Sequence, residues 1–424
     1  MYAFRKWAAT LICAAGLFAI QWSGVSGIQA QPVKGAQSSS NYEKQFNQVW
    51  ETVRDRFYDK NIHGLDWKKI GDTYRAQLPQ VKSKEEFQDL INRMLDELHA
   101  SHTTYITDND VEFYMLPAVI GQDMQGHKVE HIGIMGHQAA KEFIVAGVLD
   151  GGPAQKAGIQ SGDHLLTADG QPFSSAGSFK DKEGKSVEVV LKREGEAAVR
   201  TISVTPVKQN VLRAFLNATE TSARVIETGG KKIGYVHLWT MANDAFKRTL
   251  DGLVVGKLHD TDGLILDLRD GYGGTPFGYT DVFFRPDVAW EQHVHGQPPN
   301  VSHTGYGKPV VVLINGGTRS AKEFFTYQMK TAHRAVVVGT KTAGAFLGAG
   351  GFEIGKDGLL ELAVVGLRVD GNLLEVNGVT PDIEVPANAT YSERDKQMAV
   401  ATQKVLELIS RRVTSGDKNG VGAH

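Results

Sequence analysis

The stretch Pro309-Val-Val-Val-Leu-Ile-Asn-Gly-Gly-Thr-Arg-Ser-Ala-Lys-Glu-Phe-Phe325 decides how this chain is interpreted. Its first part, a Val-rich run that ends at Ile314, is bounded by Pro and Gly-Gly and predicts a buried strand. The part from Ala321 onward has the apolar spacing of a helix. Ser320 would then lie where a strand turns sharply into a helix, with its hydroxyl exposed beside the N–H groups of the first helical turn. A serine there can be a nucleophile, or simply the N-cap of the helix.

Strand and helix patterns alternate on both sides of this stretch. Apolar runs at 233–239, 263–268, 310–314 and 335–339 are separated by helical patterns, one across 242–258 and one after Ser320. Near-continuous apolar strands with intervening helices are typical of a parallel sheet covered on both faces. We therefore expect an α/β core over residues 209–390, with a C-terminal helix and tail over 391–424.

The N-terminal half has a different character. Residues 41–115 predict helices, because apolar residues follow helical spacing and Ser83-Lys-Glu-Glu86 is a capping-box pattern. Residues 116–208 instead alternate strand-like runs with Gly-rich turns. We expect two further domains here, one helical and one built of strands.

Composition places the chain among globular proteins of two or three domains. It has 424 residues, 41% apolar and 22% charged, and a formal net charge of -2, which provides no basic field for nucleic acid. Residues 1–30 have the basic, apolar and small-residue regions of a secretory signal peptide, and 31–40 predict a linker. Cleavage near Ala30 would remove Cys13, the only cysteine. We therefore expect a periplasmic or secreted bacterial protein with no stable membrane span after signal cleavage.

Three segments are candidates to meet Ser320. Residues 266–274 predict a strand that ends in glycines, which allow close approach and can donate N–H groups to an oxyanion. Ser101-His102 supplies a candidate base, and Glu375 a carboxylate. Asp267 and Asp382 are interpreted as caps or turn formers.

Lysine is the other side chain that could serve as the base. Lys322, two positions after Ser320, should point to a different side of the helix. Lys341 stays open as an alternative.

The chain resembles peptidase family S41, a family of serine peptidases that includes C-terminal processing proteases and the tricorn core. The motifs are Ser-His at 101–102, the Arg-to-Gly-Gly turn at 269–274, Ser-Ala-x-Glu at 320–323 and Gly-Val-x-Pro-Asp at 378–382. Residues 152–170, with Ala-Gly, Gly-Asp and Asp-Gly turns, resemble a PDZ domain. The resemblance implies a multidomain α+β protein with a helical region, a PDZ-like β domain and a ClpP/crotonase-like α/β core.

The resemblance also implies a catalytic plan. The Lys of the family's Ser/Lys dyad is absent from Thr342-Ala-Gly-Ala345, whereas every member of a Ser-His-Ser-Glu tetrad is present. His102 would deprotonate Ser320, Ser101 would orient the imidazole, and Glu375 would hold Ser101. Ala321 and either Gly273 or Gly274 would form the oxyanion hole. Family members often carry Asp where this chain has Ala100.

The implied activity is a serine endopeptidase that cleaves unfolded or C-terminally exposed polypeptides through an acyl-enzyme. The PDZ loop, with Ile132, Gly133 and Ile134, would bind a C-terminal peptide. The alternatives are a catalytically silent peptide- or lipid-binding protein and an esterase or amidase. Members of the family often assemble, which leaves a homo-oligomer open.

We expect no cofactor. We also expect no metal, because the remaining histidines considered show no His-x-x-x-His spacing among themselves: His63, His99, His131, His164, His237, His293, His295, His303 and His333.

Overall fold

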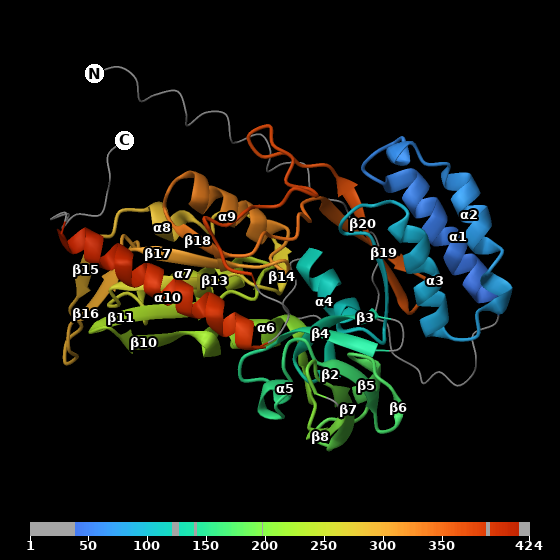
Figure 1. Cartoon of the computed structure of the whole chain (residues 1–424), viewed down its shortest axis with the longest axis horizontal. Coiled ribbons are helices and arrows are strands. Elements are labelled where there is room, and N and C mark those ends of the chain that lie inside the picture. The colour runs from blue at the N-terminus through green and yellow to red at the C-terminus, as the bar shows by residue number, and fades with distance from the viewer. Residues whose placement is uncertain (1–38, 121–126, 140–141, 197, 387–390, 415–424) are drawn as a thin grey trace.

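The computed structural model describes residues 39–120, 127–139, 142–196, 198–386 and 391–414. The predicted signal peptide and residues 31–38 of the predicted linker lie outside these ranges. Figure 1 shows helices α1–α3 at one end of the molecule and the large sheet with its helices at the other. A β-rich unit lies beside the junction between them. The predicted multidomain α+β fold is confirmed.

A six-stranded sheet forms the centre of the core, in the order β10-β11-β13-β17-β18-β21. β10 is antiparallel to β11, and all the other neighbours are parallel. Parallel strands end at the same edge of a sheet, so the segments that follow β13 and β17 emerge side by side. The strands span β10 (Arg224–Thr228), β11 (Lys231–His237), β13 (Gly263–Asp267), β17 (Val310–Ile314), β18 (Val336–Gly339) and β21 (Ile383–Glu384).

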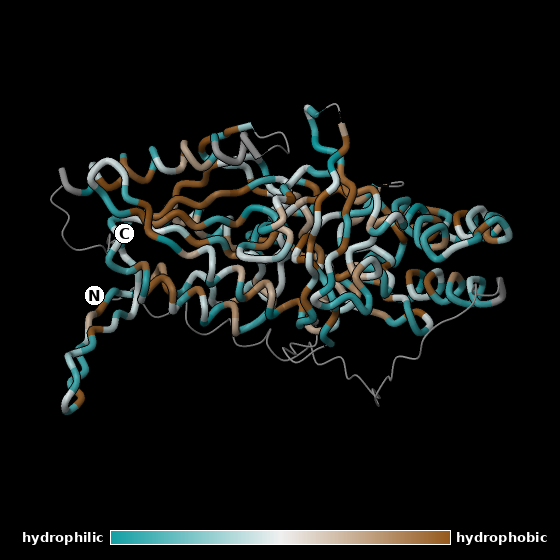
Figure 2. Tube along the Cα trace, turned by 90° about the horizontal axis from the view of Figure 1, so that it is seen from below, coloured by the Kyte–Doolittle hydropathy of each residue, from teal (hydrophilic) through white to brown (hydrophobic). Residues whose placement is uncertain are grey.

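Helices cover both faces of this sheet, and alternate side chains of each strand point to opposite faces. Val311, Leu313 and Ile265 pack against one long helix, whereas Val312 and Leu266 belong to the cluster on the other face. Figure 2 shows the apolar segments gathered inside the molecule. The helices are α6 (Val211–Ser222), α7 (Asp244–Val255), α8 (Asp281–Phe284), α9 (Ala321–Thr331) and α10 (Tyr391–Thr414), the last of which crosses the sheet in Figure 1.

The N-terminal helices pack on a separate three-stranded sheet of order β1-β20-β19. β1 pairs with β20, so the segment just after His102 shares a sheet with residues 358–361. The elements are α1 (Ser39–Arg56), η1 (Ile62–Gly64), α2 (Trp67–Arg75), η2 (Leu78–Gln80), α3 (Lys84–Asp96), β1 (Thr104–Thr107), α4 (Val111–Ile120), β19 (Gly348–Ile354) and β20 (Gly358–Val365).

The β-rich unit is built on the sheet order β3-β4-β5-β7-β8 with β6 beside β5, while β2 pairs with β9. It meets the core through Trp239, whose Nε1 donates to Asp150 Oδ2 at 3.0 Å. Its elements are β2 (Lys128–His131), β3 (Ile134–Ala139), β4 (Glu142–Val148), α5 (Pro153–Lys156), β5 (His164–Ala168), β6 (Gln171–Pro172), η3 (Gly177–Phe179), β7 (Val187–Lys192), β8 (Arg200–Val204) and β9 (Val207–Asn210).

Two short strand pairs complete the core. β12 (Thr240–Met241) pairs with β14 (Tyr272–Gly274), and β15 (Ala289–Gln292) forms a hairpin with β16 (Asn300–His303) at the edge of the molecule in Figure 1. Within the described ranges no helix combines the length and the apolar character that a membrane span requires.

A buried ion pair joins the sheet to α10. Arg269 Nη2 lies 2.5 Å from Asp267 Oδ2, and Arg269 Nη1 donates to Gln397 Oε1 of α10 at 3.1 Å. Tyr235 also donates to Asp267 at 2.9 Å. Burial by itself would raise the pKa of the Asp267 carboxyl, but the Arg269 guanidinium outweighs burial and holds that pKa far below its usual range. Asp267 thus has the structural role that its sequence position suggested.

Replacing Asp267 should destabilise the protein strongly, since Arg269 would be left charged and buried. We expect Asp267→Asn to lower the free energy of unfolding by about 3–5 kcal/mol in a denaturant titration. The matched control is Asp72→Ala, which removes an exposed i,i+4 pair with Lys68 and should cost no more than about 1 kcal/mol. Equal effects of the two variants would contradict the structural role of the Asp267 pair.

Candidate active site

Ser320 lies at the turn between β17 and α9, with a backbone strained for a serine. Its φ is 56° and its ψ is -126°. A positive φ in a residue with a Cβ costs on the order of 1–3 kcal/mol and persists only where its surroundings enforce it. Here the Ser320 N–H donates to Ala345 O at 2.9 Å and to the Glu323 carboxylate at 3.1 Å. The predicted strand-to-helix turn is present.

Glu323 is a functional position that sequence reasoning missed. Its carboxylate also accepts the N–H groups of Gly344 and Ala345, at 2.8 and 2.9 Å, and the hydroxyl of Thr342 at 2.6 Å. Burial raises the pKa of Glu323, against the effect of these donors. The Ser-Ala-x-Glu spacing was the available signal, because a carboxylate at the third helical position can reach back to the N-cap amide. Glu323 therefore holds the Ser320 turn to the 342–345 segment.

Gly273 lies directly against Ser320. A Cβ at this position would sit 2.4 Å from Ser320 Cβ, 2.7 Å from its Oγ and 2.9 Å from the Ala321 nitrogen, so only glycine fits. At Gly274 a Cβ would instead meet Met241 O at 2.3 Å. Of the two glycines, Gly273 is thus the one whose backbone faces the serine.

Lys322 is fully buried and supports the loop that leads to Gly273. Its Nζ donates to Asp270 O at 2.7 Å and to Leu268 O at 3.5 Å. Burial lowers its pKa to about 7, and the Asp267 carboxylate opposes this shift. With its amine committed to these carbonyls, Lys322 is a poor candidate for the base. Lys341 is exposed.

Ser101, His102 and Glu375 form a hydrogen-bonded chain across 274 positions of sequence. Ser101 Oγ donates to Glu375 Oε2 at 2.9 Å, and the same Oγ lies 2.9 Å from His102 Nδ1. Ser101 has one hydroxyl proton, which it donates to the carboxylate. In its contact with His102, the Ser101 oxygen must therefore be the acceptor, and His102 Nδ1 must carry a proton. This fixes the imidazole tautomer and leaves the Nε2 lone pair available as a base.

Glu375 also joins this chain to the segment beside Ser320. It is buried, at 6% exposure, and accepts from Ser101 N at 3.0 Å and from Phe346 N at 2.6 Å. Phe346 directly follows Ala345, whose carbonyl accepts from Ser320 N. The two parts of the site are therefore connected through one short stretch of backbone. Within the part of the chain that the structure describes, no hydrogen bond joins His102 to Ser320.

Arg319, next to the serine, carries a charge that affects the pKa of His102. Burial together with the Arg319 guanidinium lowers the pKa of His102 to about 3. His102 is consequently neutral at pH 7, as a proton acceptor must be.

Positive φ values occur in the hydrogen-bonded chain and directly beside it. His102 has a φ of 53°, and Val376, next to Glu375, has a φ of 66°. For a β-branched residue such a value is a true outlier. The hydrogen bond from Asn377 N to Glu375 O, at 2.8 Å, closes a three-residue turn around Val376. Strain at Ser320, His102 and Val376 together is typical of a functional site.

Residues 132–134, for which peptide binding is predicted, form the loop that leads from β2 into β3, with Ile134 as the first residue of β3. Ile132 and Ile134 are buried, and Gly133 has a φ of 77°. The Gly133 N–H donates to His131 Nδ1 at 3.1 Å, so this amide is already engaged. β3, which follows the loop, is the terminal strand of its sheet and leaves an edge to which an extended peptide could pair.

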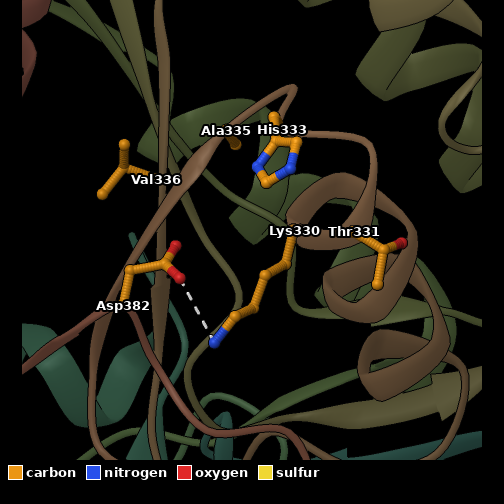
Figure 3. Close-up of a pocket in the computed structure, with 6 residues that line it drawn as sticks. All are labelled: Lys330, Thr331, His333, Ala335, Val336 and Asp382. Carbon is orange, nitrogen blue, oxygen red and sulfur yellow. Dashed lines mark ion pairs between the residues drawn. The ribbon is translucent and has the colours of Figure 1, made fainter.

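A separate depression lies at the other end of α9, with a volume of about 370 Å³. Figure 3 shows its lining residues, with Lys330 Nζ paired to Asp382 Oδ1 at 3.2 Å. Asp382 Oδ2 also accepts from Val337 N at 2.9 Å. None of the residues predicted for the tetrad lines this depression, and the contacts of Asp382 link it to β18 and to α9.

Three family models match the chain. Residues 232–385 match peptidase family S41, residues 39–96 match the tricorn protease C1 domain, and residues 118–205 match a PDZ domain. The three matches fall on the α/β core, the N-terminal helices and the β-rich unit respectively.

Curated relatives match over most of the chain. A chloroplastic C-terminal processing peptidase of Tetradesmus obliquus is 24% identical over 372 residues, covering 82% of this chain and 78% of the relative. A carboxyl-terminal-processing protease of Synechocystis is 24% identical over 394 residues, covering 89% of each. Tricorn protease homolog 1 of Streptomyces coelicolor is also 24% identical, over 88% of this chain and 36% of its own length.

Among solved structures, the crystal structure of the tricorn protease aligns with a TM-score of 0.51 and 16% identity, over 88% of this chain and 37% of that one. This likeness shows a shared fold. The S41 match covers residues 232–385, and together with the matched C1 and PDZ regions and these relatives it identifies the core as a serine-type peptidase domain of family S41.

Proposed function

We propose that this protein cleaves peptide bonds of unfolded or C-terminally exposed polypeptides, with Ser320 as nucleophile and His102, Ser101 and Glu375 as the rest of a tetrad. The observation that carries the proposal is the hydrogen-bonded chain from Glu375 through Ser101 to His102 Nδ1. It gives the histidine the tautomer that a general base needs, and it is tied to the strained Ser320 turn.

In the first step, the Ser320 oxygen attacks the carbonyl carbon of the scissile bond while His102 Nε2 takes the hydroxyl proton. The resulting imidazolium donates its Nδ1–H to Ser101 Oγ, and Ser101 keeps its own proton and donates it in a hydrogen bond to the Glu375 carboxylate. The negative carboxylate at the end of this chain offsets the new positive charge. Contact between Ser320 and His102 must tighten when substrate binds, as it often does in serine enzymes.

The tetrahedral oxyanion then needs donors on the side of Ser320 away from the base. We assign this role to the N–H groups of Ala321, in the first turn of α9, and of Gly273. Gly273 is preferred to Gly274 because its backbone touches Ser320. His102 next gives its proton to the leaving amine, which produces the acyl-enzyme, and a water deprotonated by His102 releases the acyl group.

The domain arrangement supports a polypeptide substrate. We propose a helical domain at 41–115, a PDZ domain at 116–208 and a catalytic core at 209–390, with β3 of the PDZ domain accepting an extended C-terminal peptide. Two relatives are named as C-terminal processing enzymes, and these names support the proposal that this protein acts on polypeptides with exposed C-termini. The sequence of residues 1–30 favours a periplasmic or secreted location. A catalytically silent peptide- or lipid-binding protein is the competing proposal.

The nucleophile assignment predicts that Ser320→Ala abolishes cleavage. The purified protein and the variant would each be incubated with an unfolded polypeptide ending in apolar residues, and the fragments identified by mass spectrometry. We expect a loss of at least about 10³-fold in the variant. The control is Ser302→Ala, on the β16 hairpin, which should cleave like the parent. Peptide binding without cleavage by the parent would favour the silent alternative.

The relay assignment predicts that Ser101→Ala lowers kcat with little change in KM. The variant removes the acceptor for His102 Nδ1–H and the donor to Glu375, so the imidazole loses its fixed tautomer. We expect kcat to fall by about 10²-fold or more. A control, Ser101→Thr, keeps the hydroxyl and should retain more activity than the alanine variant. Equal kcat values for the parent and Ser101→Ala would exclude the relay.

The effect of Arg319 on His102 predicts a pH profile. The acid limb of kcat/KM reports the pKa of the base in the free enzyme, so with His102 near 3 it should lie well below the usual histidine value of about 6.5. In Arg319→Met the imidazolium loses a repelling charge, the pKa rises, and the limb moves to higher pH. Arg319→Lys keeps the charge and should leave the limb in place. An unchanged limb in Arg319→Met would refute this coupling.

A further inference from the structure

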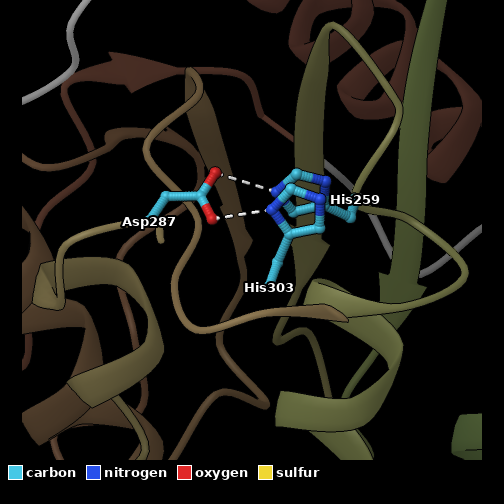
Figure 4. A group of neighbouring side chains, drawn as sticks. All are labelled: His259, Asp287 and His303. Carbon is cyan, nitrogen blue, oxygen red and sulfur yellow. Dashed lines mark hydrogen bonds and ion pairs between the residues drawn. The ribbon is translucent and has the colours of Figure 1, made fainter. Parts of the chain in front are cut away.

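A second cluster of titratable side chains shares no residue with the proposed tetrad and takes no part in the proposed catalysis. His259 follows α7, Asp287 precedes β15 and His303 ends β16. One ligand atom from each lies within 4.8 Å of the others. Figure 4 shows both imidazoles presenting a nitrogen to the same carboxylate. His259 Nε2 is 2.9 Å from Asp287 Oδ2, and His303 Nδ1 is 3.0 Å from Oδ1.

We propose that His259, Asp287 and His303 bind a divalent transition-metal ion of the Zn²⁺ type. Two imidazoles and one carboxylate are a common ligand set for Zn²⁺, whereas Mg²⁺ and Ca²⁺ prefer oxygen ligands alone. Zn²⁺ binds nitrogen at about 2.0–2.1 Å and carboxylate oxygen at about 2.0–2.2 Å. Ligand atoms around 3 Å apart can therefore share one ion, with water completing the coordination.

Burial and the neighbouring groups support a built site. His259 is 6% exposed, and its second nitrogen, Nδ1, lies 3.4 Å from Asp260 Oδ1. A carboxylate on the far nitrogen of a metal-binding histidine is a typical outer partner, because it fixes the tautomer that leaves Nε2 free. The His259 carbonyl is held by Lys308. The buried histidine is thus fixed in position, and the other two ligands come from the base of the hairpin.

One adjustment is required for an ion to bind. The two imidazole rings are stacked, with centroids 3.4 Å apart and planes inclined by 19°, so their lone pairs run nearly parallel. To converge on one ion the rings must splay apart. His303 can make this movement, since its side chain is 22% exposed and belongs to a two-stranded hairpin. Without an ion the same groups form a hydrogen-bonded His-Asp-His triad, and metal uptake distinguishes the two states.

Bound metal would tie the β15–β16 hairpin to the body of the core. An isolated two-stranded hairpin is marginally stable in water, so a link at its base adds order to residues 288–303. The prediction of no metal rested on sequence spacing, which cannot detect ligands that only the fold brings together, and it did not include His259. It also omitted His127, which does stand four residues before His131. That pair lies along β2, where four residues span about 13 Å, too far for one ion.

The test is calorimetric titration of the untagged, chelator-stripped full chain with ZnCl₂ at pH 7.5. We expect one ion per chain, and uptake at least about tenfold weaker in Asp287→Asn and in His303→Ala. The control is His293→Ala/His295→Ala, which removes two exposed histidines of the same hairpin and should bind like the parent.

Hydrogen exchange provides a second readout that does not depend on peptidase activity. Zn²⁺ should slow amide exchange over residues 288–303 in the parent but not in His303→Ala, a partly exposed position whose replacement leaves the core intact. The proposal is overturned if the parent takes up no Zn²⁺ saturably, if all variants bind it equally, or if only His293→Ala/His295→Ala loses it.

Discussion

The geometry of the proposed site depends on one buried carboxylate. Glu375 accepts hydrogen bonds from the Ser101 backbone, the Ser101 hydroxyl and the Phe346 backbone. Charge-assisted hydrogen bonds of this kind are roughly twice as strong as neutral ones, and burial increases their effect. Removing the carboxylate would leave buried donors unpaired and would release His102 from its orientation. Three distant segments are thus positioned by a single side chain.

Glu323 holds the backbone around Ser320 in place, as Glu375 does around Ser101. It accepts from Ser320 N and from two amides and a hydroxyl of the 342–345 segment. Because Ala345 and Phe346 are adjacent, the two glutamates act on neighbouring peptide groups. In this region a serine, a histidine and a valine have positive φ values, and the hydrogen bonds of the two glutamates hold the backbone beside them.

The parts that sequence reasoning predicted well are those with a local physical signature. The buried strands at 263–267 and 310–314, the helix after Ser320 and the capped helix at 84–96 follow from periodicity and from cap residues. The S41 and PDZ resemblances came from motifs that the family models also match. Sequence reasoning did not predict several contacts between residues that are far apart in the chain. The pairing of β1 with β20, the hub role of Glu323 and the His259–Asp287–His303 cluster join residues whose separation in the chain carries no periodic signal.

The pairing of β1 with β20, and of Ser101 with Glu375, also bears on when the protein can become active. The first residues of the tetrad are made early, but their partner lies 274 positions later. Contacts of such separation form late, since a long loop must close before they contribute any stability. A nascent or truncated chain that lacks Glu375 has no fixed base beside its serine. Assembly of the proposed tetrad would therefore have to wait until synthesis has reached the last part of the core, and its peptidase activity would begin only then.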